Sequence, residues 1–276
     1  MSGLPTSTPL SSKSFRLRVA CIIALAVVCV VVMGFIPAIP QNPNYHEFAD
    51  QRTLLGIPHC LNVVSNLPFL LIGILGVVFL VRTNECPVGV TFVHTRERWP
   101  FYIFFAGVAL TAFGSAYYHL QPDNQRLLWD RLPITVSFMA FFAITVAERI
   151  RQRAGDWLLW PALAAGIGSA VYWHYSELQG QGDLRWYVLV QFYPLVAIPL
   201  MLLLFPPRYT RTADIWVALA WYGLAKVLEL HAVDRGLFAA GGFVSGHTLK
   251  HLAASLGAYW ILLMLKRRRP VGVMQR

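Results

Sequence analysis

Charged residues are scarce in this sequence. They make up 13% of its 276 residues, whereas soluble globular domains usually contain about 25%. Hydrophobic residues make up 57% and form long blocks that are separated by short charged stretches. This arrangement excludes an ordinary soluble domain and is typical of membrane-spanning helices.

Cysteine is scarce as well. The chain has four cysteines, two of them inside the first apolar block, and no two are spaced as Cys-x-x-Cys. We therefore expect neither a disulfide framework nor a thiolate metal site. Internal repeats are also lacking, and the one segment of biased composition is the start of the chain, which is rich in Ser, Thr and Pro.

Several apolar blocks are long enough to cross a membrane. Each contains about 17–22 residues, which at about 1.5 Å per residue matches a hydrocarbon core of about 30 Å. The blocks cover residues 19–39, 60–81, 100–119, 131–149, 157–175, 186–205, 213–231 and 246–265. The sequence therefore predicts an all-α membrane protein with eight transmembrane helices.

The first block could also be a signal peptide, because basic residues precede it. Its apolar run is longer than the core of a usual signal peptide, and no Ala-x-Ala cleavage site follows. We therefore interpret residues 19–39 as a retained transmembrane helix. A disordered cytoplasmic start is expected at residues 1–18, and a basic cytoplasmic tail at 266–276.

The net charge of +10 raises the question of nucleic-acid binding. The basic residues, however, fall between the apolar blocks and at both ends of the chain. If the N-terminus is cytoplasmic, most of the 23 Lys and Arg residues lie in cytoplasmic segments, which is the positive-inside pattern. An even number of helices then places both termini in the cytoplasm, and no nucleic-acid partner is expected.

Polar residues at the ends of three blocks form a pattern. Ser115 and His119 lie four residues apart at the end of the third block and share one helix face. Asp130 immediately precedes the fourth block, and His247 and His251 lie four residues apart at the start of the last one. By the helix count, these ends all lie on the extracytoplasmic side. We therefore expect the five side chains to lie close together there.

Three neutral imidazoles with one open position form a typical catalytic zinc site. In such a site Asp130 would orient a water molecule or carry its proton, and Ser115 would hydrogen-bond an oxyanion or support Asp130. Simpler roles exist for each residue alone: packed histidines, a helix-capping Asp130 and a small Ser115 between helices. Ionisable groups in membrane spans are costly and usually functional, so their convergence favours a metal site.

A second group of ionisable residues lies in and after the seventh block. Lys226, Glu229 and Asp234 are possible contacts for a substrate headgroup, although Lys226 and Glu229 could simply neutralise each other. The same three residues could form the charge path of a transporter, but the sequence has no inverted repeat and no paired broken helices to support one.

The five-residue pattern resembles a known family. The order Ser115-x3-His119-x10-Asp130, followed by His247-x3-His251, is similar to that of the alkaline ceramidases. These enzymes belong to the wider CREST group of seven-helix membrane hydrolases, which includes the adiponectin-type receptors. The segment Asn62-Val63-Val64-Ser65-Asn66 is similar to the family's Asn-x-x-Ser-Asn. The resemblance covers residues 44–265 and implies a seven-helix bundle, to which 19–39 adds an extra N-terminal helix.

The resemblance also implies a site and an activity. Zinc would be held by His119, His247 and His251, with catalytic roles for Asp130 and Ser115. The reaction would be hydrolysis of the amide bond of ceramide to a sphingoid base and a fatty acid. Another N-acyl lipid of the membrane is an alternative substrate. The main alternative function is a lipid-binding receptor with structural zinc.

Two departures from the family concern calcium. Residues 45–50 match the acidic calcium-binding start of the animal enzymes poorly, and His59 stands where those enzymes carry a glutamate. We therefore expect zinc and do not carry calcium over. Short loops and the lack of a retention signal favour a bacterial inner membrane over the endoplasmic reticulum or Golgi.

Overall fold

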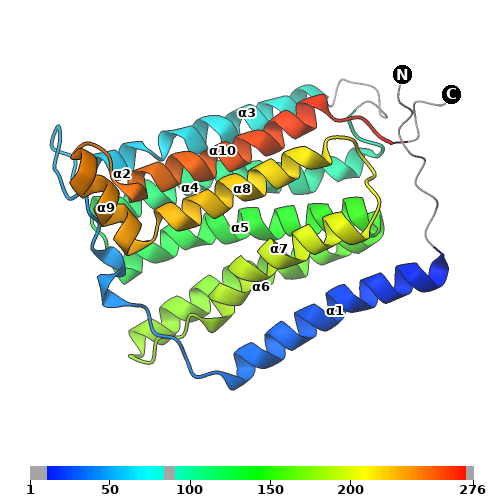
Figure 1. Ribbon diagram of the computed structural model, residues 1–276, viewed down its shortest axis with the longest axis horizontal. Coiled ribbons are helices and arrows are strands. Elements are labelled where there is room, and N and C mark those ends of the chain that lie inside the picture. Colours follow the sequence, from blue (N-terminus) through cyan, green and yellow to red (C-terminus); the bar gives the residue numbers. More distant parts are fainter. Residues whose placement is uncertain (1–10, 84–90, 272–276) are drawn as a thin grey trace.

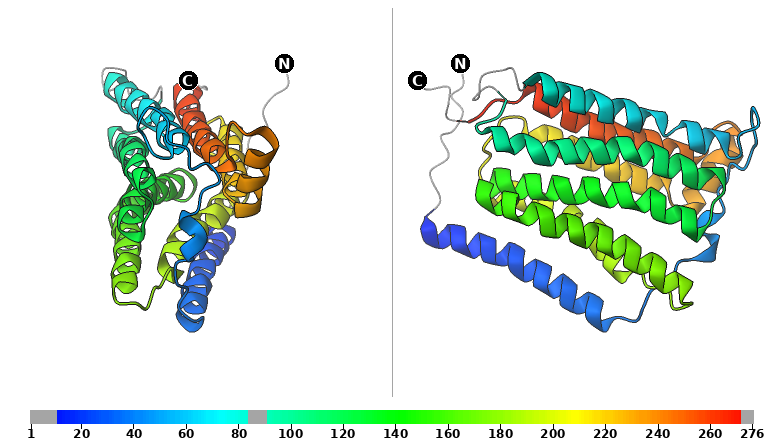
Figure 2. Two further views of the ribbon diagram at one scale, coloured as in Figure 1. Left: turned by 90° about the vertical axis from the view of Figure 1, so that its left-hand side faces the viewer. Right: turned by 180° about the vertical axis from the view of Figure 1, so that it is seen from behind.

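The computed structural model describes residues 11–83 and 91–271 as an all-helical bundle without a strand among them (Figure 1). Its α-helices are α1 (Ser12–Phe35), α2 (Cys60–Val64), α3 (Leu67–Thr83), α4 (Arg98–Leu120), α5 (Asn124–Arg149), α6 (Gln152–Leu178), α7 (Arg185–Leu204), α8 (Thr212–Leu228), α9 (His231–Gly241) and α10 (Gly246–Arg267). Short 3₁₀ helices, η1 (Pro43–His46) and η2 (Thr95–Glu97), precede α2 and α4. The long helices lie side by side, and successive ones run in opposite directions (Figures 1 and 2).

Six helical segments in the described part of the chain are long and apolar enough to cross a membrane. They are Ser12–Phe35, Cys60–Thr83, Thr95–Leu120, Asn124–Arg149, Arg185–Leu204 and Gly246–Arg267. The predicted spans 157–175 and 213–231 correspond to α6 and α8, which lie in the same bundle but are not among the six. A multi-pass membrane protein is therefore supported, whereas the count of eight spans stays a prediction.

The start and the end of the chain are more ordered than expected. Residues 12–18, for which disorder is predicted, form the first turns of α1, because the Ser11 side chain caps that helix by accepting a hydrogen bond from the Ser14 N–H. In the expected tail, Lys266 and Arg267 belong to α10, and Arg268 is fully buried. The predictions for residues 1–10 and 272–276 lie outside the described residues.

Two predicted spans are interrupted. The span 60–81 contains the junction between α2 and α3, where the Asn66 side chain donates to the Asn62 carbonyl at 2.8 Å. That carbonyl would accept the Asn66 backbone N–H in a continuous helix, so the side chain competes with the helix. The span 213–231 ends early: α8 stops at Leu228, Leu230 is extended, and α9 starts at His231.

The packing of α4 against α5 brings their connected ends close together. A Cβ atom at Gly114 would overlap the backbone oxygen of Trp129, so only glycine permits this approach. Helix α1 is the least embedded of the long helices, with Ile22 as its one buried residue, and it lies along α7 at the edge of the bundle (Figure 1). Its exposed apolar side chains suit contact with lipid.

The bundle has two chemically different ends. We call the end where α4 finishes and α5 and α10 begin the histidine end, because it contains His119, His247 and His251. We call the opposite end, where α4 begins and α5 and α10 finish, the basic end, because it contains Arg98, Arg149 and Arg268. The apolar core lies between them.

Candidate metal centre

Two helices supply the three histidines of the candidate site. His119 lies in the last turn of α4, and His247 and His251 lie in the first two turns of α10. The start of α10 is fixed by Ser245, whose hydroxyl accepts the Thr248 N–H at 3.1 Å. All three imidazoles are buried. The predicted meeting of these helix ends is therefore confirmed.

The three rings converge on one point. One nitrogen of each ring lies within 4.8 Å of the corresponding nitrogens of the other two. The Nε2 atoms of His119 and His247 are 3.2 Å apart, and two nitrogens bound to one tetrahedral zinc at about 2.0–2.1 Å would lie about 3.3 Å apart. The ring of His251 completes the group, with centroids 5.0 Å from His119 and 4.9 Å from His247. Three buried imidazoles arranged in this way could hold one metal ion.

The neighbours of the histidines orient them. The Ser65 hydroxyl lies 2.8 Å from Nδ1 of His251, which leaves Nε2 of that ring directed to the common point. A partner on the second nitrogen of this kind is usual for metal-binding histidines because it fixes the ring and its tautomer. His119 lacks one: its Nδ1 is buried without a hydrogen bond in the described structure.

Two further contacts hold α10 in place. Asn62 accepts a hydrogen bond from the Thr248 hydroxyl at 2.7 Å, which ties α2 to α10 as expected of an asparagine that bridges helices. Asp234 accepts the backbone N–H of His247 at 2.6 Å and that of Ala49 at 2.9 Å. Asp234 is buried and has this structural role, so its proposed contact with a headgroup stays a prediction.

An aromatic side chain packs against two of the three histidines. The ring of Phe48 lies 4.3 Å from that of His247 and 4.8 Å from that of His119, measured between centroids. Phe48 belongs to the segment between α1 and α2, which crosses the histidine end (Figure 1). The acidic residues of that segment pair with arginines, Glu47 with Arg235 and Asp50 with Arg52.

Asp130 and Ser115 lie together, as predicted. Both are buried, and both line the same cavity where α4 packs against α5. Helix α5 is capped by Asp123, whose carboxylate accepts the Arg126 N–H. Asp130 is therefore not the N-cap of this helix, and the simpler role of a helix-capping residue is excluded for it.

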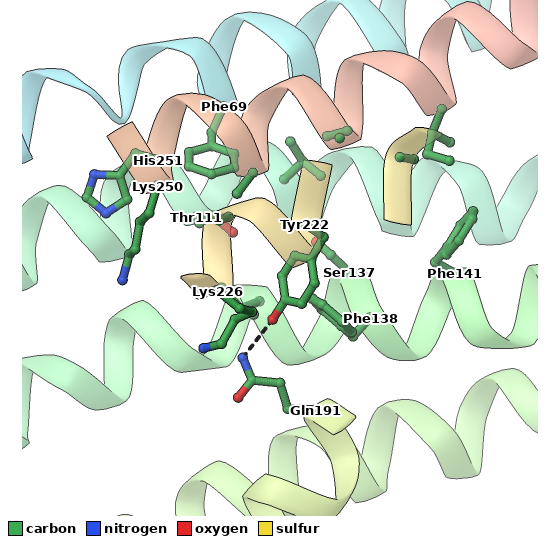
Figure 3. Close-up of a pocket in the computed structure, with 18 of the residues that line it drawn as sticks. Phe69, Thr111, Ser137, Phe138, Phe141, Gln191, Tyr222, Lys226, Lys250 and His251 are labelled. Atoms are coloured by element: carbon green, nitrogen blue, oxygen red, sulfur yellow. Dashed lines mark hydrogen bonds between the residues drawn. The ribbon is translucent and has the colours of Figure 1, made fainter. Parts of the chain in front are cut away.

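A cavity joins these groups. Its wall includes His251, Asp130 and Ser115, and it continues between apolar side chains of α3, α4, α5, α7, α8 and α10 (Figure 3). Along α10 the lining residues extend from Lys250 and His251 to Ile261. Ile261 lies ten residues beyond His251 on one helix, which corresponds to about 15 Å. The cavity is thus a deep apolar pocket with polar groups gathered at one end.

Three charged side chains complete that polar end. Glu229 forms ion pairs with Lys226 and with Lys250, the latter at 2.5 Å. All three residues line the same cavity as His251, and Figure 3 shows the two lysines beside it. The expectation that Lys226 and Glu229 pair with each other is confirmed, and the participation of Lys250 was not expected.

Some residues of the site that were not predicted nevertheless have a partial signal in the sequence. Ser65 belongs to the Asn-x-x-Ser-Asn segment, but its hydrogen bond to His251 depends on the break between α2 and α3. Lys250 directly precedes His251, so its place at the histidine end follows from the same helix as two of the candidate ligands. Phe48 lies outside the regular helices, and no periodicity indicates where such a residue packs.

The chain was compared with protein-family models, with curated proteins and with solved structures, and nothing matches in any of the three comparisons. The site must therefore be interpreted from its own chemistry.

Proposed function

We propose that the protein is a zinc-dependent intramembrane hydrolase that cleaves the amide bond of ceramide or a related N-acyl lipid. The products would be a sphingoid base, or another amine, and a fatty acid. One observation carries the proposal: His251, the Asp130 carboxylate and the Ser115 hydroxyl line the polar end of a deep apolar cavity. A lipid acyl chain suits such a cavity, and its amide would then lie at the reactive groups.

The ligand set favours zinc. Neutral imidazoles are typical zinc ligands, and three of them leave the fourth tetrahedral position open. Zinc in such a site acts as a Lewis acid and lowers the pKa of water to near neutrality. His119, His247 and His251 would hold the ion, and the Ser65 hydroxyl would keep His251 in the required orientation.

The protein's own groups would move the protons. The Asp130 carboxylate accepts the proton of the attacking water and delivers it to the leaving amine nitrogen. Ser115, which lines the same cavity, would orient that carboxylate by a hydrogen bond. Once Asp130 has taken the proton, the Ser115 hydroxyl is available to donate to the developing oxyanion. The cavity walls exclude bulk water from the acyl chain.

The charge distribution supports a position in the membrane. The basic end would face the cytoplasm together with both termini, and the histidine end would lie near the extracytoplasmic face. A substrate would enter sideways between helices, so that its tails stay in hydrocarbon. We propose the bacterial inner membrane as the location.

A lipid-binding receptor with structural zinc is the second candidate. The observation that favours it is the cover over the histidines, where Phe48 packs against two of the rings. A metal beneath this cover would tie α4 to α10 without any turnover. Fatty-acid release separates the two candidates, because only the hydrolase produces it.

The test combines metal content with fatty-acid release. Purified protein is offered ceramides and other N-acyl lipids, and Asp130→Ala is compared with the wild type. The hydrolase account predicts release by the wild type, a loss of about 10²–10⁴-fold in Asp130→Ala because the proton carrier is gone, and unchanged zinc. Full activity in Asp130→Ala would remove its assigned role, and zinc without release from any lipid would favour the receptor.

A further inference from the structure

A charged cluster in the cavity has a surplus of positive charge. Lys226 and Lys250 both bind Glu229, which also accepts a hydrogen bond from the Tyr45 hydroxyl at 3.3 Å. The side chains of Lys250 and Glu229 are only 16% and 15% exposed. Among the described residues, Glu229 is the one carboxylate that forms an ion pair with either lysine. Two ammonium groups thus share one carboxylate.

Such a surplus is costly inside a membrane protein. A partly buried ammonium group loses hydration, and like charges repel more strongly where the dielectric constant is low. Charged residues in membrane spans therefore usually have partners or serve a ligand. Asp130 also lines the cavity and attracts Lys250, although it forms no ion pair with either lysine in the described part of the chain. A divalent ion held by the three imidazoles would more than offset this single negative charge and restore the surplus.

The position of the cluster indicates what it would contact. Lys226 and Glu229 lie at the end of α8, level with the polar end of the cavity, while Ala218 and Leu219 of the same helix line its apolar part. A fatty acyl chain would occupy the apolar part and place its carbonyl near Ser115 and His251. The part of the molecule beyond the amide nitrogen would then lie beside the two lysines (Figure 3).

We propose that the preferred substrate is an anionic N-acyl lipid, in which a carboxylate or a phosphate on the amine side binds Lys226 and Lys250. This inference rests on the proposed hydrolase function and narrows it. Hydrolysis adds water across the C–N bond: the hydroxyl goes to the acyl carbon and the proton to the nitrogen, which gives a fatty acid and an anionic amine. The hydroxyl groups of neutral ceramide would leave the surplus charge in place, whereas an anionic group would neutralise it.

The binding test uses three lipids that share one acyl chain. N-palmitoylglycine carries a carboxylate, its methyl ester is neutral, and the phosphate ester of N-palmitoylethanolamine carries a phosphate. Equilibrium binding is measured with full-length Ser115→Ala protein in nanodiscs, because this variant keeps every charged side chain that lines the cavity, and recovery of intact lipid confirms that no hydrolysis has occurred. Because charge-assisted hydrogen bonds contribute strongly, at least one anionic lipid should bind about tenfold more tightly than the ester. The tighter anion identifies carboxylate or phosphate as the preferred group.

Variants of the lysines connect that preference to the cluster. Lys226→Gln, made in the same background, should remove most of the preference, and Lys226→Arg should keep it because the positive charge is retained. Lys266→Gln is the matched control, since Lys266 is exposed at the basic end and its replacement should change nothing. Binding of both anionic lipids no tighter than that of the ester would overturn the inference, as would a preference that survives Lys226→Gln.

The wild type then separates this inference from the proposed function. Release of palmitate from the neutral ester or from ceramide, without any preference for the anions, would support the proposed hydrolase function and overturn the proposed anion site. A Lys226-dependent preference without palmitate release from any lipid would support the anion site and overturn the hydrolase function. Palmitate release that is faster from the better-binding anion would support both.

Discussion

The two ends of the bundle both bury charged or ionisable side chains, but the partners of these side chains differ between the two ends. At the basic end, Arg268 is enclosed by partners: it donates to Glu148 at 2.5 Å and to the Thr91 carbonyl at 3.1 Å, and its guanidinium lies 4.0 Å from the centre of the Tyr209 ring. At the histidine end, the three imidazoles face one another, and among the described residues no carboxylate forms an ion pair with them. The charge of Arg268 is thus matched by Glu148, although its Nη2 atom has no hydrogen bond in the described structure, whereas the three imidazoles could hold a metal ion.

The charged residues that line the cavity come from the histidine end and not from the basic end. The cavity is lined by His251, Asp130 and the Lys226–Glu229–Lys250 cluster, and none of the arginines of the basic end contributes to it. Buried charge alone therefore does not mark a functional site in this protein. The histidine end differs because its buried ionisable side chains adjoin a cavity with space for a ligand.

The largest expected effect on stability is at the basic end. Arg268→Met leaves Glu148 without its partner, and breaking a buried ion pair typically costs about 3–5 kcal/mol. Thermal unfolding in detergent should show a clearly lower Tm. Metal content per folded molecule should not change, because the histidine end is distant. Loss of the metal in Arg268→Met would contradict the division between the two ends.

An intermediate effect is expected where α4 meets α5. Gly114→Ala must push Ser115 away from the start of α5, because the new Cβ overlaps the Trp129 backbone. A misplacement of about 1 Å at catalytic groups can cost about a hundredfold in rate, so fatty-acid release should fall by about that factor. The control is Gly168→Ala in α6, where a Cβ meets nothing within 4 Å and turnover should be unchanged. Wild-type turnover in Gly114→Ala would show that this helix contact does not position the site.

The smallest effect concerns the segment that covers the histidine end. Burial raises the pKa of Asp50, but hydrogen bonds from the Arg52 side chain and backbone N–H lower it by more, so the pKa lies below its usual 3.8. The pair therefore stabilises the fold fully above about pH 4, and this contribution disappears as the pH falls through the lowered pKa. Because Arg52 is 38% exposed, Asp50→Asn should cost less than about 1 kcal/mol near neutral pH.

The pH dependence of that difference is the check. Unfolding of the wild type and of Asp50→Asn is followed from about pH 7 down to about pH 3. The difference in stability should shrink towards acid pH, because the wild-type carboxylate is protonated there. A difference that grows as the pH falls would show that Asp50 is not held in its charged form by Arg52.

Much of the candidate site follows from the sequence by counting helices. His119, Asp130 and His247 lie at block ends, and alternation of direction places those ends together whatever the details of packing. The orientation of the whole bundle in a membrane is a separate matter, and it stays a prediction based on the positive-inside pattern.

Other features could not be predicted because they depend on local competition or on irregular segments. The break between α2 and α3 arises when the Asn66 side chain competes for a backbone carbonyl, and hydropathy does not report such an event. The separation of α8 from α9 depends on the extended backbone of Leu230. The contacts of Phe48 depend on a segment without helical periodicity.

The central claim is that the histidine end holds a metal ion. The most direct measurement is the zinc content of purified wild type, His251→Ala and His174→Ala, where His174 is a histidine of α6 outside the triad. The account predicts equal zinc in the wild type and His174→Ala, and its loss from His251→Ala together with fatty-acid release. Zinc that is absent from the wild type, or that remains fully bound in His251→Ala, would contradict the account.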